Sequence, residues 1–464
     1  MLRCPENAVS GIGLQTINGV FMKCLRLIVI GFAVLLIATE PVNAGDALKK
    51  LTKQKLSAIR ESNVSLRNNW QEVPRSGPYH EYRANLHVHS HWSHDSRGQI
   101  EDIVEAAKKA GTRVLMFTEH PAEHYDFFRD GHQGIRDDVL LIPGAEMNGF
   151  LVYPTMSLKG INVGSPQELS DLVRGRNGQL FVSHPEERMD WQIEGVSGIE
   201  IYNTHADFKE EKELISALKN PLRVYQLAGL IREFPQECYS ALQDYPRDYL
   251  RKWDTLSLGA PHTGVAANDA HQNIGIAIRW LEADQARLED ALGEKLFDLN
   301  LSLVPGSKEM REGRQPGDIL FQMQLDPYEN ALRHAGTHLL IEGDLSESSV
   351  RESLEAGRVF VGFDWIADSR GFDFHLESEN DSGVVRVEMG DQMPWKQGSK
   401  AVASAPLPVH WKLIRNGEIV AESDGRTFEK PVEADGVYRV EAWVDVDHEP
   451  MIWILSNPVR IDGQ

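Results

Sequence analysis

A chain of 464 residues exceeds one ordinary domain, so we expect two folded units. Hydrophobic residues make up 41% and charged residues 25%, a globular composition that allows a large core. The formal net charge of −21 disfavours a long nucleic acid as substrate or partner, because such polymers are bound by neutralising their phosphates with Lys and Arg. With 3 cysteines and no CxxC pair, metal ligands must come from His, Asp and Glu.

The N-terminus has the pattern of an export signal. Lys23 and Arg26 precede an apolar run at 27–38, which is too short to span a bilayer but fits a secretory signal peptide. We therefore expect residues 1–44 to be a signal peptide with an upstream extension, because Met22 could be the true start. The alternative is an uncleaved anchor. The expected mature protein is exported, either periplasmic or secreted, and is not stably inserted in a membrane.

Beyond this segment, residues 45–80 are polar with scattered leucines, and they predict a helical lead-in that ends at a proline-rich stretch. From residue 81 onward, short apolar runs alternate with helical patterns. The clearest unit is a strand at 84–86, a helix from Ile100 that Gly111 ends, and a buried strand at 114–117. A βαβ unit of this kind predicts a parallel sheet.

The same alternation continues along the chain. It predicts strands at 139–142, 180–182, 198–201 and 264–267, and helices at 166–173, 210–219 and 288–297. The expected fold class is therefore α/β, with residues 81–365 forming a closed or nearly closed β/α barrel. A last helix at 346–356 and a strand at 358–361 complete this part.

Residues 366–464 show a different pattern. Alternating strands are separated by Gly and Asp turns, and Asn416-Gly417 is a hairpin signal. The expected strands lie at 372–376, 384–389, 409–415, 437–444 and 451–455. We expect a smaller all-β, sandwich-like domain that packs, contacts carbohydrate or binds an unknown partner.

Potential metal ligands follow the predicted strands of the barrel. The C-terminal ends of barrel strands share one face, so side chains far apart in sequence should converge there. Each residue alone has an ordinary structural explanation, and the prediction rests on their joint arrangement. Imidazole and carboxylate ligands suit zinc, manganese or iron. The residues concerned are His87, His89, Glu119, His120, Glu146, His184, Asp269 and His271.

Several stretches, in this order, resemble the motifs of the PHP (polymerase and histidinol phosphatase) superfamily. The resemblance covers about residues 82–363, and the run at 93–98 with the β-rich tail is most similar to the exported carbaryl-hydrolase-like branch. It implies a distorted β/α barrel with two or three divalent ions. The stretches are His87-Val88-His89, Ser93-His94-Asp95, Thr118-Glu119-His120, Pro143-Gly144-Ala145-Glu146, Ser183-His184-Pro185, Glu200-Ile201-Tyr202-Asn203 and Asn268-Asp269-Ala270-His271.

The resemblance also implies a set of ligands for each ion. His87, His89, Glu146 and Asp269 would hold one ion, and Glu146 with His184 would hold a third. The second ion would be held by His120, His271 and either Asp95 or His94, with Asp95 preferred. Family members often have a further histidine within the segment that here is 148–182. Its absence leaves open whether two or three ions bind.

Other residues near these motifs are candidates for catalysis and binding. His94 is a candidate catalytic residue, and Arg97 is a candidate for substrate binding because a guanidinium suits phosphate. Asn203 either binds substrate or caps a turn. His205 is expected to lie behind the ligands or in solvent.

The predicted function is hydrolysis of a small phosphate ester through metal-bound hydroxide. A first alternative is a carbamate or carboxylic ester hydrolase that uses the same metals. A second is a 5′–3′ exonuclease or nucleotide phosphatase, although a nuclease would need a basic groove. A third is a non-catalytic protein that binds a metal or ligand.

Overall fold

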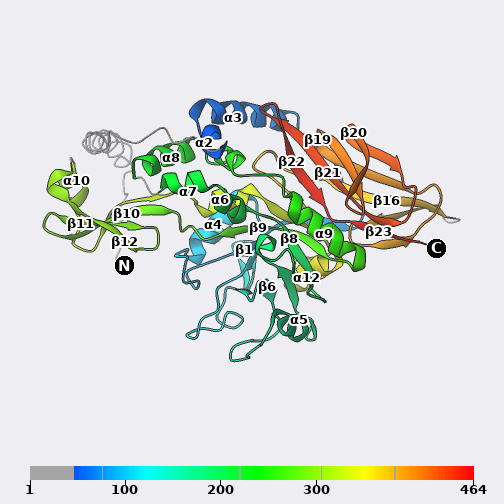
Figure 1. The fold of residues 1–464 in the computed structure, drawn as a ribbon, viewed down its shortest axis with the longest axis horizontal. Helices are drawn as coiled ribbons and strands as arrows, with labels where there is room; N and C mark the ends of the chain where they lie inside the picture. Colours follow the sequence, from blue (N-terminus) through cyan, green and yellow to red (C-terminus); the bar gives the residue numbers. More distant parts are fainter. Residues whose placement is uncertain (1–45, 76, 219–220, 305, 381–382, 464) are drawn as a thin grey trace, which may run out of the picture.

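The computed structural model describes residues 46–75, 77–218, 221–304, 306–380 and 383–463. The chain has a mixed α/β fold in three parts (Figure 1): a central barrel, a C-terminal β region on one side and a small separate sheet on the other. The predicted signal peptide at 1–44 lies outside the described residues. Among the helices of the described part, none is both long enough and apolar enough to cross a membrane.

The helical lead-in forms two helices, α2 (Asp46–Lys50) and α3 (Lys53–Asn68). Thr52 caps α3, since its side chain accepts a hydrogen bond from the Lys55 amide. Arg67 at the other end of α3 donates to the carbonyl oxygens of Trp365 and Ile366, at 2.6 and 3.0 Å. The lead-in therefore lies against the C-terminal β region, beside β22 (Glu449–Ser456) in Figure 1.

The barrel is built around β1 (Tyr79–Val88), which pairs in parallel with β2 (Val114–Phe117) and β9 (Thr263–Ala270). From β2 the ring continues through a bridge between Glu119 and Ala145, and it returns to β9 through parallel pairs. Antiparallel pairs interrupt the ring in between, which is the distortion expected of this barrel. The strands between are β5 (Ala145–Met147), β6 (Phe150–Tyr153), β7 (Gln179–Val182) and β8 (Gly198–Asn203).

The βαβ unit expected from the sequence is present. Its helix, α4 (Ile100–Ala110), buries Ile100, Ile103, Val104 and Ala107, and it ends at Gly111, whose φ is 79°. Only glycine adopts that left-handed conformation without steric cost. Next along the chain, β4 (Val139–Ile142) pairs in parallel with β2, β3 (Gly134–Arg136) pairs with the other edge of β4, and α5 (Pro166–Arg174) precedes β7.

A small sheet interrupts the barrel after β9. It has the strand order β12-β11-β10-β13, and a separate cluster of buried residues that includes Ile278, Leu288 and Leu320. The helix predicted at 288–297 is wrong, because this segment forms β11, a turn at Gly293 with φ 92°, and the start of β12. The strands are β10 (Gly275–Glu282), β11 (Gln285–Asp290), β12 (Lys295–Asn300) and β13 (Ile319–Gln324), with α10 (Ser307–Arg311) before β13.

The barrel and the C-terminal region share a continuous sheet. β14 (Gly336–Glu342) pairs with β1, β15 (Val359–Gly362) pairs with β14, and β22 pairs with β15. The helix α12 (Glu347–Ala356) connects β14 to β15. The remaining strands are β16 (Asp373–Asn380), β17 (Gly383–Glu388), β18 (Gln392–Pro394), β19 (Lys400–Arg415), β20 (Glu418–Pro431), β21 (Gly436–Val446), β22 (Glu449–Ser456) and β23 (Val459–Asp462). Fully buried Trp365, Trp411 and Trp453 lie in the core.

A buried group of charges joins β1, β14 and the loop after β15. His338 lies 2.8 Å from Glu81 through Nδ1 and 3.0 Å from Asp364 through Nε2, and Asp364 also pairs with Arg83 at 3.0 Å. Burial alone would lower the pKa of His338, but the attraction of Asp364 and Glu81 outweighs it and raises this pKa to about 9.

This raised pKa predicts a pH-dependent stability. Because the folded pKa lies above the unfolded value of about 6.5, the contribution of His338 is complete below that pH and is lost as the pH rises through 9. We expect His338→Gln to remove up to about 3 kcal/mol of unfolding free energy at pH 6 and much less at pH 10. Urea unfolding across this range measures the difference between the two proteins.

His410→Gln is the matched control, because its ring also pairs with carboxylates, Asp424 and Glu422, but at the exposed surface. It should change stability little at either pH. A constant difference between wild type and His338→Gln from pH 6 to 10 would contradict the assignment.

Candidate metal centre

The predicted ligands lie together at one end of the barrel. His87 and His89 stand at the end of β1, Asp269 and His271 at the end of β9, and Glu146 on β5. Asp95, His120 and His184 complete the group from loops that follow β1, β2 and β7. The convergence expected from the strand ends is therefore present, and the ligand atoms form two clusters.

The inner cluster consists of His87, Glu146, His184 and Asp269, whose ligand atoms lie within 4.8 Å of one another. His87 Nε2 is 3.2 Å from Glu146 Oε2 and 3.1 Å from Asp269 Oδ1. His184 Nε2 is 3.4 Å from the second oxygen of each carboxylate. Two carboxylates thus face two imidazoles, which is a donor set that suits zinc, manganese or iron.

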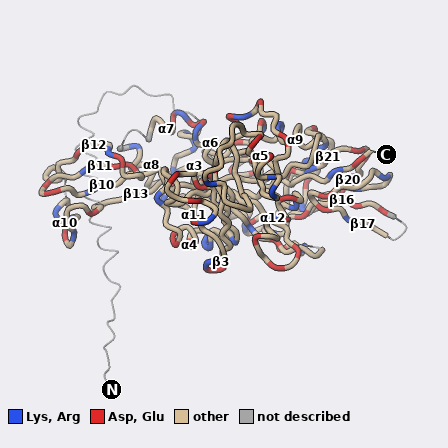
Figure 2. Tube along the Cα trace, turned by 90° about the horizontal axis from the view of Figure 1, so that it is seen from below, with Lys and Arg blue, Asp and Glu red and all other residues tan. Residues whose placement is uncertain are grey.

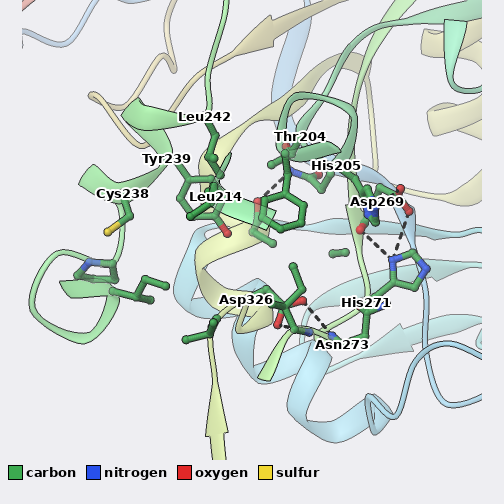
Figure 3. A pocket seen from close by; sticks show the side chains of 18 of the residues that line it. Thr204, His205, Leu214, Cys238, Tyr239, Leu242, Asp269, His271, Asn273 and Asp326 are labelled. Atoms are coloured by element: carbon green, nitrogen blue, oxygen red, sulfur yellow. Dashed lines mark hydrogen bonds and ion pairs between the residues drawn. The ribbon is translucent and has the colours of Figure 1, made fainter. Parts of the chain in front are cut away.

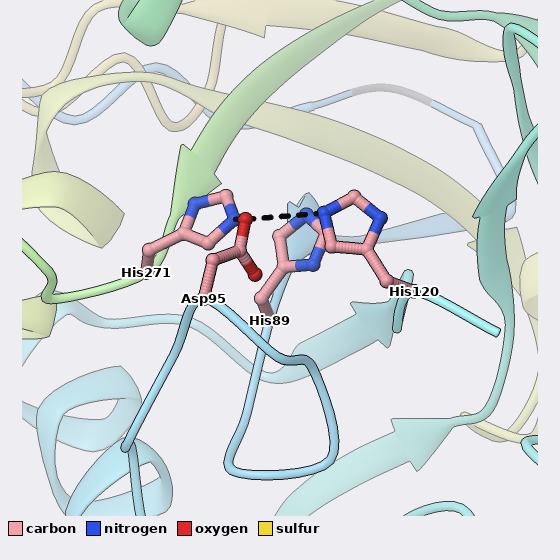
Figure 4. A group of neighbouring side chains, drawn as sticks. All are labelled: His89, Asp95, His120 and His271. Carbon is pink, nitrogen blue, oxygen red and sulfur yellow. Dashed lines mark ion pairs between the residues drawn. The ribbon is translucent and has the colours of Figure 1, made fainter. Parts of the chain in front are cut away.

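The outer cluster consists of His89, Asp95, His120 and His271 (Figure 4). Asp95 Oδ2 lies 3.2 Å from Nε2 of both His120 and His271. The ring of His89 stacks on that of His271, with 3.9 Å between centroids. His89 Nε2 is also 3.4 Å from Asp269 Oδ1, so the two clusters adjoin across Asp269.

His89 and His184 lie in different groups from those that the resemblance implied. The candidate groups place His89 with Asp95 and His184 with His87, but His89 Nε2 also lies 3.7 Å from Glu146 Oε2, so the implied ligand sets stay a prediction. Alternation along an extended strand places His87 and His89 on one side, and their rings are indeed 5.2 Å apart. However, the pairing register of β1 shifts between Leu86 and Val88, so a bulge at His87 turns the two imidazoles toward different clusters.

Three residues of the inner cluster have left-handed backbones. The φ angles are 62° for His87, 45° for His184 and 49° for Asp269. Residues other than glycine rarely adopt this conformation, and it is maintained only where the surrounding structure imposes it. Strain of this kind at three strand ends is typical of a functional site.

The donor atoms of both clusters fit divalent ions. In each of four histidines, Nδ1 faces a hydrogen-bond acceptor and Nε2 faces the cluster. The acceptors are Glu200 for His87, Ser93 for His89, Glu186 for His184 and the Asp269 carbonyl for His271. Within the described residues, Nε2 of His87, His89 and His271 is buried without a hydrogen-bond partner, as are Oδ1 of Asp95 and of Asp269. Unpartnered buried polar atoms are costly, and an ion would satisfy them.

Electrostatics in the site keep the carboxylates ionised. Neighbouring histidines outweigh burial and hold the pKa values of Asp95, Glu146 and Asp269 below their usual range. Conversely, the carboxylates outweigh burial at His184 and His271, raising their pKa values to about 10 and about 9. Burial lowers the pKa of His89 to about 3. An ion that binds Nε2 of His184 or His271 must displace a proton, so metal binding should release protons.

Two buried glutamates orient the ligands from behind. Glu200 Oε1 accepts from His87 Nδ1 at 2.7 Å, while Oε2 accepts from the His184 amide and from Asn203, both at 2.9 Å. Glu119 accepts from Ser93 Oγ at 2.7 Å, and this hydroxyl in turn accepts from His89 Nδ1 at 3.0 Å. Such partners fix the tautomer and the ring orientation of ligating histidines.

The remaining predicted residues lie at the margins of the clusters. The side chain of His94 is 78% exposed, and its Nδ1 is 4.0 Å from Asp95, so the outer cluster includes Asp95 and not His94. Arg97 is exposed and donates to the carbonyl oxygens of His94 and Ser96. Asn203 is buried and caps α6 (Thr204–Glu210) by accepting from the His205 and Ala206 amides. Asn203 therefore caps a turn, which is one of its two expected roles, and substrate binding by Asn203 stays a prediction.

His205 was not among the residues predicted to be metal ligands. Its Nδ1 lies 3.3 Å from Asp269 Oδ2, and it forms a third possible ligand group with Asp269 and His271. The sequence pattern could have indicated this role, because His205 follows β8 just as His184 follows β7. Glu200 was also overlooked as a supporting residue, although an acid inside a fully buried strand needs a partner.

The role of Glu200 can be tested by Glu200→Gln, which keeps the size of the side chain but removes its charge. Because the carboxylate orients and polarises His87, we expect metal affinity to fall roughly 10- to 100-fold. Competition with a chromophoric chelator measures this affinity. Glu187→Gln, at an exposed site near His184, is the control and should not change it. Equal affinities for wild type and Glu200→Gln would show that Glu200 does not support the metal site.

Two comparisons found proteins to which this chain is similar. Residues 85–259 match the family model of the PHP domain. The span contains the ligands from His87 to His184, while Asp269 and His271 lie beyond it. The chain is also similar to the crystal structure of a two-domain protein containing a predicted PHP-like metal-dependent phosphoesterase from Bacteroides vulgatus ATCC 8482. The identity is 13%, the TM-score is 0.35, and the match covers 84% of this chain and 98% of that one. No curated protein matches the sequence.

The PHP resemblance is thus confirmed for residues 85–259, and the fold class is confirmed as α/β with a barrel followed by a β region. The carbaryl-hydrolase-like branch stays a prediction.

Proposed function

We propose that the protein is a metal-dependent hydrolase that cleaves a small phosphate ester. The observation that carries this proposal is the pair of four-residue clusters that adjoin across Asp269. Zinc, manganese or iron bound there would polarise the ester and make water a better nucleophile. We assign one ion to each cluster, and His205 with Asp269 and His271 offers a place for a third.

In this reaction, water supplies the oxygen that bonds to phosphorus, the bond from phosphorus to the alcohol oxygen breaks, and that oxygen takes a proton. The chain provides the positions for these events. Half-buried Glu146 and buried Asp269 stay ionised between the clusters and would balance the charge of bound cations. His94 stands at the exposed edge, with its ring centroid 4.9 Å from that of His120, where it can give a proton to the leaving alcohol.

The net charge of the chain and its predicted export also favour a small substrate. The net charge is −21, and Figure 2 shows Lys and Arg interspersed with Asp and Glu along the described chain. Such a mixed surface suits a small ester better than a long nucleic acid. The signal pattern at 1–44 supports an exported, periplasmic or secreted enzyme.

A metal and substrate panel tests the proposal. The protein is stripped with a chelator, reloaded with Zn²⁺, Mn²⁺ or Fe²⁺, and assayed with phenyl phosphate, diphenyl phosphate, a phenyl carbamate and an oligonucleotide. We expect phosphomonoester hydrolysis that chelation removes and metal restores. Faster carbamate cleavage would make the protein a carbamate hydrolase instead. Turnover that survives chelation, or metal binding without any turnover, would refute the proposal.

A further inference from the structure

An apolar cavity opens beside the metal clusters. It has a volume of about 120 Å³ and lies between the end of β9 and the helices that follow β8 (Figure 3). Three residues of the metal centre, His205, Asp269 and His271, form part of its wall. The helices are α6, α7 (Lys212–Leu218), α8 (Pro221–Glu233) and η2 (Glu237–Ala241).

Most of the cavity wall away from the metal centre is hydrocarbon. Aliphatic and aromatic side chains line it, among them Phe208, Leu214, Leu227, Ile231 and Leu242. Leu214 and Leu227 are buried, which places them in the interior rather than on an open surface.

Two polar side chains of the wall, Asn268 and Asp326, are hydrogen-bonded to the backbone of the protein itself. Asn268 donates to the carbonyl oxygens of Ala331 and Ala335, each at 2.9 Å. Asp326 accepts from the amides of Asn273 and Ile274, at 2.9 and 3.0 Å. A polar group of a ligand would lose its hydrogen bonds to water here without gaining new ones from these atoms. An apolar group has no such hydrogen bonds to lose, so its entry costs little free energy.

The size of the cavity limits its occupant. Engineered apolar cavities of roughly 150 Å³ stay dry and take up benzene. A cavity of about 120 Å³ therefore suits one aromatic ring or a branched alkyl group of similar size. Asp269 and His271 belong to both the cavity wall and the metal centre. An apolar group in the cavity would therefore be joined to the rest of its molecule at the metal centre.

We infer that the substrate is a phosphate monoester of an apolar alcohol, whose single ring or compact alkyl group fills this cavity. This inference rests on the proposed function and narrows it to a substrate class. The cavity binds the alcohol part, and the metal centre binds the phosphate. Selection arises from burying hydrocarbon, for which no hydrogen bond from the substrate is needed.

Two esters with matched leaving groups test the inference. Benzyl phosphate and glycerol 1-phosphate both release a primary alcohol, but only the first carries an apolar ring. We expect kcat/KM for benzyl phosphate to exceed that for glycerol 1-phosphate by about 100-fold. Equal values, with both esters hydrolysed, would overturn the inference and leave the proposed function standing.

Substitutions at Leu227 change the cavity in opposite directions. Leu227→Phe fills it, and we expect the benzyl preference to fall by about tenfold or more. Leu227→Ala enlarges the cavity, and we expect the ratio of kcat/KM for 2-naphthylmethyl phosphate to kcat/KM for benzyl phosphate to rise. Leu303→Phe, at a leucine that is 79% exposed, is the control and should leave both ratios as in wild type. Unchanged ratios in both Leu227 variants would overturn the inference.

A binding measurement separates the cavity from the chemistry. Calorimetry with benzyl alcohol, the product, reports occupancy without turnover, and we expect Leu227→Phe to weaken this binding about tenfold or more. Binding of benzyl alcohol by a protein that hydrolyses none of the esters would support the cavity and refute the proposed function. No binding of benzyl alcohol to folded wild-type protein would overturn the cavity assignment.

Discussion

Asp269→Asn should remove turnover almost completely, with kcat/KM lower by about 1000-fold or more. The Asp269 carboxylate lies 3.1 to 3.4 Å from imidazole nitrogens of five histidines, and it belongs to both the inner cluster and the group that contains His205. Asparagine keeps the shape but loses the negative charge that balances bound cations. We therefore expect the variant to lose metal as well as activity, which elemental analysis and steady-state kinetics measure on the same sample.

The matched control for this variant is Asp424→Asn. Asp424 also pairs with a histidine, His410 at 2.9 Å, but its side chain is 87% exposed and lies on β20, far along the chain from the barrel. Metal content and kcat/KM should both match wild type. An Asp269→Asn protein that retains wild-type metal content and turnover would refute the metal centre.

The positions of the ligands could be predicted from sequence because they follow a rule of topology. A parallel barrel brings its strand ends to one face, so each buried apolar run that ends in His, Asp or Glu supplies a side chain there. His87, Glu146, His184 and Asp269 meet for this reason. The partition of these residues between clusters could not be predicted, because it depends on the bulge at His87, which pattern alone does not reveal.

The small sheet after β9 was missed for a related reason. Leu288, Leu292 and Leu296 are spaced four apart, which matches a helical face. Gly293 contradicts that interpretation, since its left-handed φ of 92° reverses the chain between β11 and β12. Local periodicity was therefore outweighed by the pairing of β11 with strands on either side of it.

The apolar cavity is a further feature that could not be predicted from the sequence. Its wall combines Leu214 and Leu227 from two helices with Asp269 and His271 from β9. In sequence, these leucines have the spacing of any buried helix face, and nothing distinguishes residues that touch a void from residues that fill the core. Substrate selectivity therefore could not be inferred until the helices were placed against β9.

The second large effect concerns the join between the barrel and the C-terminal region. Arg439 on β21 binds Asp254 on α9 (Arg247–Gly259) through two hydrogen bonds of 2.7 and 2.8 Å, and it binds Glu441 at 2.7 Å. All three side chains are largely buried. Arg439→Met leaves Asp254 and Glu441 without their cation, so we expect it to destabilise the protein by about 3–5 kcal/mol in urea unfolding.

Two further variants separate the unpaired charge from other effects of the substitution. Arg439→Met combined with Asp254→Met should recover part of the lost unfolding free energy, because one of the two unpaired carboxylates is then removed. Lys400→Met breaks an exposed pair with Glu429 and should cost less than about 1 kcal/mol. Since Arg439 connects α9 to β21, its loss should also weaken the coupling between the two parts, so that the C-terminal region unfolds at lower urea than the barrel. Arg439→Met with wild-type stability would show that the continuous sheet through β15 and β22 is sufficient to hold the two parts together.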